Sequence, residues 1–193
     1  MARRVKCPSC LNGDLEISEV PYKVPYFGML LLITMRCERC GFTHRDVFSV
    51  ENREPMRYEV RIKSPEDLKI RVIRSSSGTI RIPELGVRVD PGPFSEGFIS
   101  NVEGVLERVE AAAIALKHGA ENPEEAERCD EFLDALRRAR NGLLEFTLIL
   151  EDPYGNSAIL SVDEGKVLRR KLTEEEVKRL KTGRLQLSPS REA

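Results

Sequence analysis

The sequence predicts a mainly β protein with an α-helical insert, in which an N-terminal four-cysteine zinc ribbon precedes a β domain. Three observations predict this class. Two Cys-x-x-Cys pairs lie within the first 40 residues, apolar and polar residues alternate with period two after residue 50, and two segments between residues 99 and 141 show helical spacing. We expect a zinc ribbon over residues 1–50, a β domain over 51–165 with a helical hairpin at about 99–141, and a C-terminal helix and tail over 166–193.

The composition is that of a globular protein without a strong charge bias. Hydrophobic residues make up 40% and charged residues 33% of the 193 residues, which is enough apolar side chain to fill a core. The formal net charge of -1 gives no general attraction for polyanions. The single Gln, the absence of Trp and the many charged residues of both signs are typical of a thermophile.

The N-terminal sequence and the hydropathy pattern predict a cytoplasmic monomer that does not contact a membrane. The longest apolar run covers only residues 29–33, whereas a membrane span needs about 20 apolar residues. The basic N-terminus is not followed by the apolar stretch of a secretory signal.

Four of the five cysteines predict one structural zinc site. Cys7 and Cys10 form one pair and Cys37 and Cys40 the other, and two such knuckles complete the tetrahedral shell that Zn²⁺ prefers. Redox pairs and disulfides are the alternatives, but a redox pair usually opens a helix after a strand, and disulfides do not suit a cytoplasmic protein. Four thiolates leave no open coordination position, so we expect no catalytic residue at this metal.

The segment between the two knuckles predicts a pair of antiparallel strands, at about 15–20 and 29–35. His44 lies close enough to replace a zinc ligand, but with a complete cysteine set we expect it on the ribbon surface. Cys129 lies within a helical pattern and is expected to be a small core residue.

Short strands are expected in the β domain wherever apolar residues alternate with polar ones. These segments are 56–62, 68–72, 80–82, 87–89, 146–150 and 159–162. Strands of this length, separated by turns rich in Pro, Gly and Ser, favour a sandwich or a barrel-like domain.

Two helices are expected between these groups of strands. Ser100 is predicted to cap the first, with Glu103 completing a capping box, and Asn122 caps the second, with Pro123 in its first position. The short connection implies an antiparallel hairpin, which carries more acidic than basic residues. A further short helix is expected from Thr173 to Lys181.

Seven segments, in order along the chain, resemble the ZPR-type zinc-finger proteins, a family that binds translation elongation factor 1-alpha. They are Cys7-Pro-Ser-Cys10, Val24-Pro-Tyr-Phe27, Cys37-Glu-Arg-Cys-Gly-Phe42, Asp67-Leu68, Ile82-Pro-Glu-Leu85, Val102-Glu-Gly104 and Asp152-Pro-Tyr-Gly-Asn-Ser157. Eukaryotic members resemble two such modules in tandem, whereas this sequence resembles the single-module form expected of an archaeal member.

The resemblance implies a fold, a cofactor and a partner. The fold is a double-stranded β-helix with an inserted helical hairpin, the cofactor is one structural Zn²⁺, and the partner is elongation factor 1-alpha, whose folding the eukaryotic members assist. Two loops are the candidate partner-binding residues. They contain Pro25, Tyr26 and Phe27, and Asp152, Pro153, Gly155, Asn156 and Ser157.

Purely structural roles for these loop residues, and a different function for the chain, remain open from the sequence. Tyr26 and Phe27 could equally close the small core of the ribbon or pack against the next domain, and residues 152–157 could simply form a turn. A nucleic-acid-binding ribbon is the alternative function, because basic residues surround the knuckles at Arg3, Arg4, Lys6, Arg36, Arg39 and Arg45. An enzyme is not expected, because His44 lies in the ribbon and His118 at the end of a helix, so neither lies on a predicted strand of the β domain.

Overall fold

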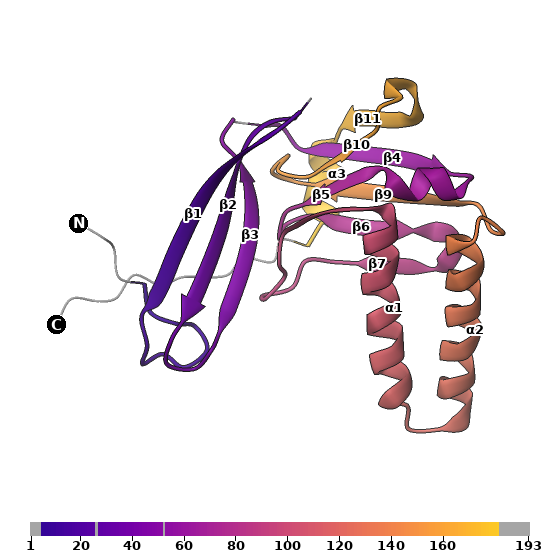
Figure 1. Ribbon diagram of the computed structural model, residues 1–193, viewed down its shortest axis with the longest axis horizontal. Coiled ribbons are helices and arrows are strands. Elements are labelled where there is room, and N and C mark those ends of the chain that lie inside the picture. Colours follow the sequence, from indigo (N-terminus) through magenta and orange to yellow (C-terminus); the bar gives the residue numbers. More distant parts are fainter. Residues whose placement is uncertain (1–4, 26, 52, 182–193) are drawn as a thin grey trace.

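The computed structural model describes residues 5–25, 27–51 and 53–181, which form a three-stranded ribbon beside a two-sheet β domain with a projecting helical hairpin (Figure 1). The strands are β1 (Leu15–Val24), β2 (Gly28–Cys37), β3 (Thr43–Ser49), β4 (Met56–Ile62), β5 (Arg71–Arg74), β6 (Thr79–Ile82), β7 (Val87–Val89), β8 (Phe98–Asn101), β9 (Phe146–Asp152), β10 (Ala158–Leu160) and β11 (Val167–Lys171). The helices are α1 (Val102–His118), α2 (Pro123–Arg140) and α3 (Glu174–Arg179), with short 3-10 turns at Pro65–Lys69, Pro83–Leu85 and Glu164–Lys166.

The ribbon is an antiparallel sheet in the order β1-β2-β3. The sequence predicts two of these strands, whereas β3 is the third and pairs with β2 along its whole length. The expectation that His44 lies on the surface is wrong, because its side chain is buried, as is that of Asp46 on the same strand. A strand whose buried positions are polar lacks the apolar alternation from which strands are predicted.

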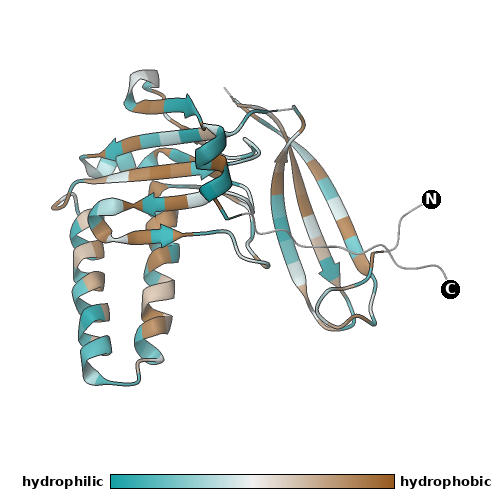
Figure 2. Cartoon of the chain, turned by 180° about the vertical axis from the view of Figure 1, so that it is seen from behind, coloured by the Kyte–Doolittle hydropathy of each residue, from teal (hydrophilic) through white to brown (hydrophobic). Residues whose placement is uncertain are grey.

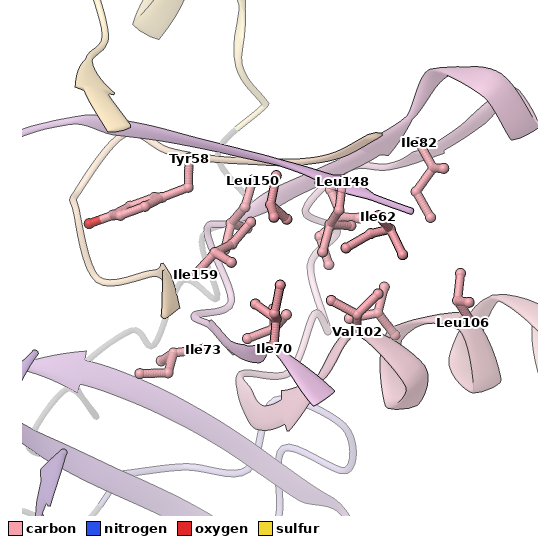
Figure 3. Packing of buried hydrophobic residues seen from close by; sticks show 14 of the residues in the cluster. Tyr58, Ile62, Ile70, Ile73, Ile82, Val102, Leu106, Leu148, Leu150 and Ile159 are labelled. Atoms are coloured by element: carbon pink, nitrogen blue, oxygen red, sulfur yellow. The ribbon is translucent and has the colours of Figure 1, made fainter. Parts of the chain in front are cut away.

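The β domain is a sandwich of two antiparallel sheets, one in the order β11-β4-β9-β6-β7 and the other in the order β10-β5-β8. The apolar side chains of both sheets meet between them. Figure 3 shows Leu148 and Leu150 of the larger sheet facing Ile70 and Ile159, and Val102 at the start of α1 lies in the same layer. The class expected from the sequence, mainly β with a helical insert, is therefore confirmed.

Two details of the β domain differ from the expected ones. The predicted strand at 68–72 begins as a 3-10 turn at Pro65–Lys69 and becomes extended only at Arg71, because Asp67 accepts hydrogen bonds from the backbone of residues 63 and 64 and so bends the chain. At the other end, β11 pairs with β4, so residues 167–171 belong to the same sheet as the strands that precede the expected boundary at 165.

The hairpin consists of α1 and α2, which lie side by side and project away from the sandwich (Figure 1). Its inner face is fixed to the core by Leu106, Leu136 and Ala139. Figure 2 shows that α1 is more apolar than α2, although both helices extend well beyond the sheets. None of the helices in the described part of the chain combines the length and apolar character needed to span a bilayer.

The residue that caps α1 is Asn101, so the prediction of Ser100 is wrong. The Gly104 N–H donates to Asn101 Oδ1 at 2.8 Å, while Ser100 is paired with Val72 as part of β8. The start of α2 matches its prediction, since Asn122 Oδ1 accepts from the Glu125 N–H at 3.0 Å and Pro123 follows. Neighbouring capping residues are hard to distinguish in sequence, because either Ser or Asn can cap a helix.

The ribbon and the β domain share one hydrophobic core at one end of the ribbon. Val24, Phe27, Leu30 and Val47 of the ribbon belong to the same buried cluster as the sandwich residues. Hydrogen bonds from backbone N–H groups connect the same parts: Ser49 N–H to Asn156 Oδ1 at 3.0 Å, Ser76 N–H to Asp46 Oδ1 at 2.7 Å and Gly97 N–H to the Arg45 carbonyl at 2.9 Å. The Ser76 hydroxyl also donates to Asp46. The ribbon and the β domain are therefore held in a fixed relation by burial as well as by polar contacts.

Candidate functional site

The four cysteines meet at the end of the ribbon that lies farthest from the shared core. The Sγ atoms of Cys7 and Cys40 are 3.6 Å apart, those of Cys10 and Cys37 are 3.8 Å apart, and all four lie within 4.8 Å of one another. A tetrahedral zinc with Zn–S bonds of about 2.3 Å requires sulfurs about 3.8 Å apart. The donor set therefore fits one Zn²⁺ with four thiolates and no free coordination position, which is a structural site.

The two knuckles have the same backbone geometry. In the first, the Leu11 N–H donates to the Cys7 carbonyl at 2.9 Å, and in the second the Gly41 N–H donates to the Cys37 carbonyl at 2.9 Å. Both donors have a positive φ, 59° at Leu11 and 76° at Gly41. Each knuckle is therefore the same turn, in which the residue after the second cysteine has a left-handed backbone conformation. This turn brings the two sulfurs of each knuckle together.

Gly13 permits the first knuckle to approach the second. A Cβ at this position would lie 2.6 Å from Cys37 Sγ and 3.4 Å from Cys10 Sγ. Contacts of 2.6 Å are too short for any side chain carbon. A larger residue would therefore push the sulfurs apart.

Metal binding at this centre is coupled to proton release. The backbone N–H of Asn12 is the main cause that lowers the pKa of the Cys10 thiol to about 6. The Phe42 N–H acts to lower the pKa of Cys40, but burial and the neighbouring sulfurs outweigh it and raise that pKa to about 11. Zinc requires thiolates, so its binding must displace a proton from Cys40 at neutral pH.

The predicted turn at 152–157 is a buried hydrogen-bond network whose side chains mostly face inward. Asp152 accepts from the Ser75 hydroxyl at 2.7 Å, from Ser77 at 2.9 Å and from Ser157, and both Asp152 and Ser157 are fully buried. A buried carboxylate with this many donors is held in one position. The network orders the turn, and Tyr154 is the residue that it presents outward, with 40% of its surface exposed.

The structure of this turn requires glycine at position 155. Its φ is +67°, and a Cβ would lie 2.3 Å from the carbonyl oxygen of Glu54. Any other residue would separate the turn from the segment that connects the ribbon to β4. Asn156 is the direct connection, because its side chain accepts from the ribbon backbone at Ser49.

Phe27, predicted to be a partner anchor, is buried in this structure. Only 5% of its surface is exposed, and the Arg53 guanidinium lies 4.0 Å from the centre of its ring. Pro25 is exposed, and Tyr26 lies outside the described residues. The structure therefore supports the alternative role of Phe27, which is to pack against the next domain.

Exposed apolar residues that the sequence did not single out lie beside the turn. Phe48 and Val50, at the end of β3, are 38% and 63% exposed, and together with Pro153 and Tyr154 they line a shallow hollow of about 580 Å³. We call this hollow the junction surface. The sequence offers no sign of it, because Phe48 and Val50 have the same alternation as residues that face a core.

The basic residues expected near the knuckles differ in what they contact. Arg3 and Arg4 lie outside the described residues. Lys6 pairs with Asp14 at 2.8 Å, and Arg39 donates to the Asn12 carbonyl at 3.3 Å.

Comparison with known proteins gives a consistent family for this arrangement. A family model described as the ZPR1 jelly-roll domain matches residues 66–188. An uncharacterized ZPR1-like protein of Methanocaldococcus jannaschii is 47% identical over 182 residues, which cover 94% of this chain and 90% of that protein. A second ZPR1-like protein, from Pyrococcus horikoshii, is 42% identical over 92% of this chain and 80% of its own length.

Eukaryotic relatives match over a smaller share of their length. The zinc finger chaperone zpr1 of Schizosaccharomyces pombe is 29% identical over 157 residues, which cover 78% of this chain and 34% of that protein. The human zinc finger protein ZPR1 is 31% identical over 161 residues, which also cover 34% of that protein. With its four-cysteine ribbon and jelly-roll domain, the chain belongs to the ZPR1 family of zinc-finger proteins, in the form found in archaea.

Proposed function

We propose that the chain is a cytoplasmic, non-enzymatic factor that binds translation elongation factor 1-alpha and assists its folding, using the junction surface. Membership of the ZPR1 family supports a protein partner, and the fission yeast relative is named a zinc finger chaperone. The metal supports the same conclusion, because a four-thiolate zinc serves to hold the ribbon in shape and not to activate water.

The observation that carries the proposal is the position of the exposed aromatic residues. Phe48 comes from the ribbon and Tyr154 from the β domain, and both line the same hollow. The residues beneath them are fixed, because Asn156 bonds the ribbon backbone and Asp152 holds the turn. Rigid aromatic side chains that need no reordering are favourable binding anchors.

The two candidate loops therefore contain residues with two different roles under this proposal. Tyr154 and Pro25 face outward and contact the partner, whereas Phe27, Asp152 and Ser157 keep the loops in place from inside. Stable complexes bury about 800 Å² on each partner, so we expect the contact to extend beyond the hollow along the ribbon.

Calorimetric titration of purified elongation factor 1-alpha, in its GTP and GDP forms, tests the proposal. Tyr154→Ala and Phe48→Ala should each weaken binding by about 2 kcal/mol, the scale of an aromatic anchor. Leu168→Ala is the matched control, because Leu168 is an exposed apolar residue on β11 that does not line the hollow. Absence of heat at tens of micromolar in both nucleotide states would refute the partner, and equal binding by all variants would refute the surface.

A further inference from the structure

A large hollow lies between the helical hairpin and the β7–β8 segment, away from the junction surface. Its volume is about 1200 Å³, and none of its lining residues also lines the junction surface. We call it the hairpin groove. Its apolar lining includes Val87, Phe98, Val105, Val109, Leu116 and Phe132.

The charges around the hairpin groove are unbalanced. Five arginines line it against two glutamates, Glu96 and Glu125. Of these arginines, the described part of the chain pairs Arg88 alone with a carboxylate, Asp90 at 2.9 Å. Glu125 is engaged at the start of α2, where it accepts from the Glu121 N–H. The other four arginines are Arg45, Arg74, Arg108 and Arg128.

Arg74 is a buried guanidinium without a carboxylate partner among the described residues. Only 5% of its surface is exposed, its Nε donates to the Gly78 carbonyl at 2.9 Å, and its Nη1 donates to the Glu96 carbonyl at 3.0 Å. Its Nη2 is buried and has no hydrogen-bond partner in this part of the chain. Unsatisfied buried donors of this kind are rare in folded proteins, because leaving one unpaired is costly.

Arg108 brings a second positive charge to the same place. The guanidinium carbons of Arg108 and Arg74 lie 4.4 Å and 5.9 Å from the centre of the Phe98 ring. Burial is the main cause that lowers the pKa of Arg74, and the charge of Arg108 acts in the same direction, against Asp46 and Asp152. An incoming carboxylate would reduce this repulsion and accept hydrogen bonds from both guanidinium groups.

We propose that the hairpin groove binds a peptide segment of a partner protein that carries an acidic side chain between apolar side chains, with the carboxylate received by Arg108 and Arg74. The volume exceeds the range of about 300–1,000 Å³ that is typical of small-molecule pockets and suits several residues of peptide. The apolar positions of the peptide contact α1, where Leu116 is 70% exposed. This inference does not depend on the partner proposed above.

A nucleic acid is a poorer match to this lining. Phosphate backbones bind to exposed basic residues on polar surfaces, whereas the lining here includes many valine, alanine and phenylalanine residues. Part of the positive charge also comes from the Arg74 guanidinium, and Arg74 is only 5% exposed. A single carboxylate reaches such a group more readily than a sugar-phosphate chain does.

A random twelve-residue peptide display library, selected on the intact zinc-loaded protein and counter-selected on Arg108→Glu, tests the proposal. We expect enriched peptides with Asp or Glu flanked by Leu, Ile or Phe. The best peptide is then synthesised with an amidated C-terminus and a fluorescein label, so that side chains alone supply carboxylates. Its affinity is measured by fluorescence anisotropy.

Arg108→Glu should lower the affinity for this peptide at least tenfold, and Leu116→Ser about fivefold. The control Arg138→Glu makes the same charge change on the exposed side of α2, outside the groove, and should change the affinity less than twofold. Replacing the acidic residue of the peptide with its amide should match the loss seen with Arg108→Glu.

Several results would overturn the proposal. These are no enrichment, enrichment of peptides without acidic residues, or binding that Arg138→Glu weakens as much as Arg108→Glu. The same holds if a twelve-nucleotide RNA binds more tightly than the best peptide in an Arg108-dependent way. Light scattering that detects an Arg108-dependent dimer would instead assign the groove to a second copy of the chain.

Discussion

The two ends of the ribbon sheet are stabilised by different kinds of interaction. At the metal end, the buried cluster consists only of Cys7, Leu15 and Cys37 among the described residues. At the opposite end, Phe27 and Leu30 belong to the large core that they share with the sandwich. A three-stranded sheet of this size cannot bury enough apolar surface alone, so coordination replaces burial at one end and docking supplies burial at the other.

Between these ends the ribbon is exposed, with Ile17, Val20 and Tyr22 of β1 facing solvent to a large extent. The metal end nevertheless touches the β domain, because the rings of Phe42 and Phe94 are 6.2 Å apart in an edge-on arrangement. The comparison teaches that the ribbon is an extension of the β domain at its docked end and a zinc-dependent element at its metal end. Substitutions at the two ends should therefore separate the contribution of zinc coordination from that of docking into the shared core.

Removal of zinc should have the largest effect, and the effect should be confined to the metal end. Structural zinc contributes roughly 10 kcal/mol or more to folding in small zinc domains. Cys7→Ser, or a chelator, should abolish amide protection in residues 5–15 and 35–43 while β9 remains protected. Hydrogen exchange with mass spectrometry measures this, and elemental analysis should find one zinc per chain.

The control for zinc removal is Cys129→Ser, which removes a partly buried thiol on α2 and should leave one zinc bound. β9 belongs to the core that the docked end of the ribbon shares. If Cys7→Ser unfolded β9 together with the knuckles, the metal end and the docked end would unfold as one cooperative unit, which would contradict the difference between them.

Phe27→Ala should destabilise the docked end by about 3 kcal/mol without loss of zinc. The substitution leaves a cavity in the shared core and removes the contact between the ring and Arg53. Chemical denaturation gives the change in unfolding free energy. Tyr22→Ala removes a comparable aromatic residue from the exposed part of β1 and should change it by less than about 0.5 kcal/mol.

Asp67→Asn should destabilise the β domain equally with and without zinc, by about 2 kcal/mol at neutral pH. Asp67 is buried and pairs with Lys166, and it accepts from the Lys63 N–H at 2.9 Å. Burial by itself raises the pKa of Asp67, but Lys166 and the backbone donors outweigh it and hold that pKa below its usual value.

The pH dependence of this effect has a definite sign. A carboxyl group with a lowered pKa in the folded state stabilises the fold at pH values above its unfolded pKa of about 4. That stability is lost as the pH falls through the lowered pKa. The difference between wild type and Asp67→Asn in urea unfolding should therefore shrink below pH 4, whereas the exposed control Asp134→Asn should show little difference at any pH. A difference that grew on acidification would contradict this assignment.

Leu11→Gly should give the smallest effect and should stabilise the metal end. Leu11 has a φ of 59°, which is unfavourable for leucine by about 1 kcal/mol, and its side chain is exposed. Part of this gain is offset by the greater chain entropy of glycine, so we expect about 0.5 kcal/mol tighter zinc binding in a chelator competition. Leu143→Gly, at an exposed loop leucine without a positive φ, should leave zinc binding unchanged and lower the stability.

Local patterns predicted the elements that are formed from local interactions. The two knuckles, the start of α2 at Asn122 and Pro123, and the strands β4 and β9 follow from residue spacing alone. The third ribbon strand and β11 were not predicted, because neither shows an alternation of apolar and polar residues that matches a buried face. In β3 the buried positions include His44 and Asp46, and in β11 every side chain after Val167 is exposed. Local propensity also does not distinguish Ser100 from Asn101 as the cap of α1, because both residues can cap a helix and both lie in β8, and it is the Asn101 side chain that accepts from the Gly104 N–H.

The sequence by itself determined the metal site, since ligand type and spacing are sufficient to specify a four-thiolate zinc and a closed shell. It also determined the family and the order of strands, hairpin and strands. Only the tertiary structure decided which loop residues face outward. Phe27 and Asp152 are buried while Phe48 and Tyr154 are exposed, because the ribbon docks with one end in the core of the sandwich. Whether a side chain is buried depends on how the entire chain packs. Residues of similar type in similar loops can therefore be buried in one case and exposed in another.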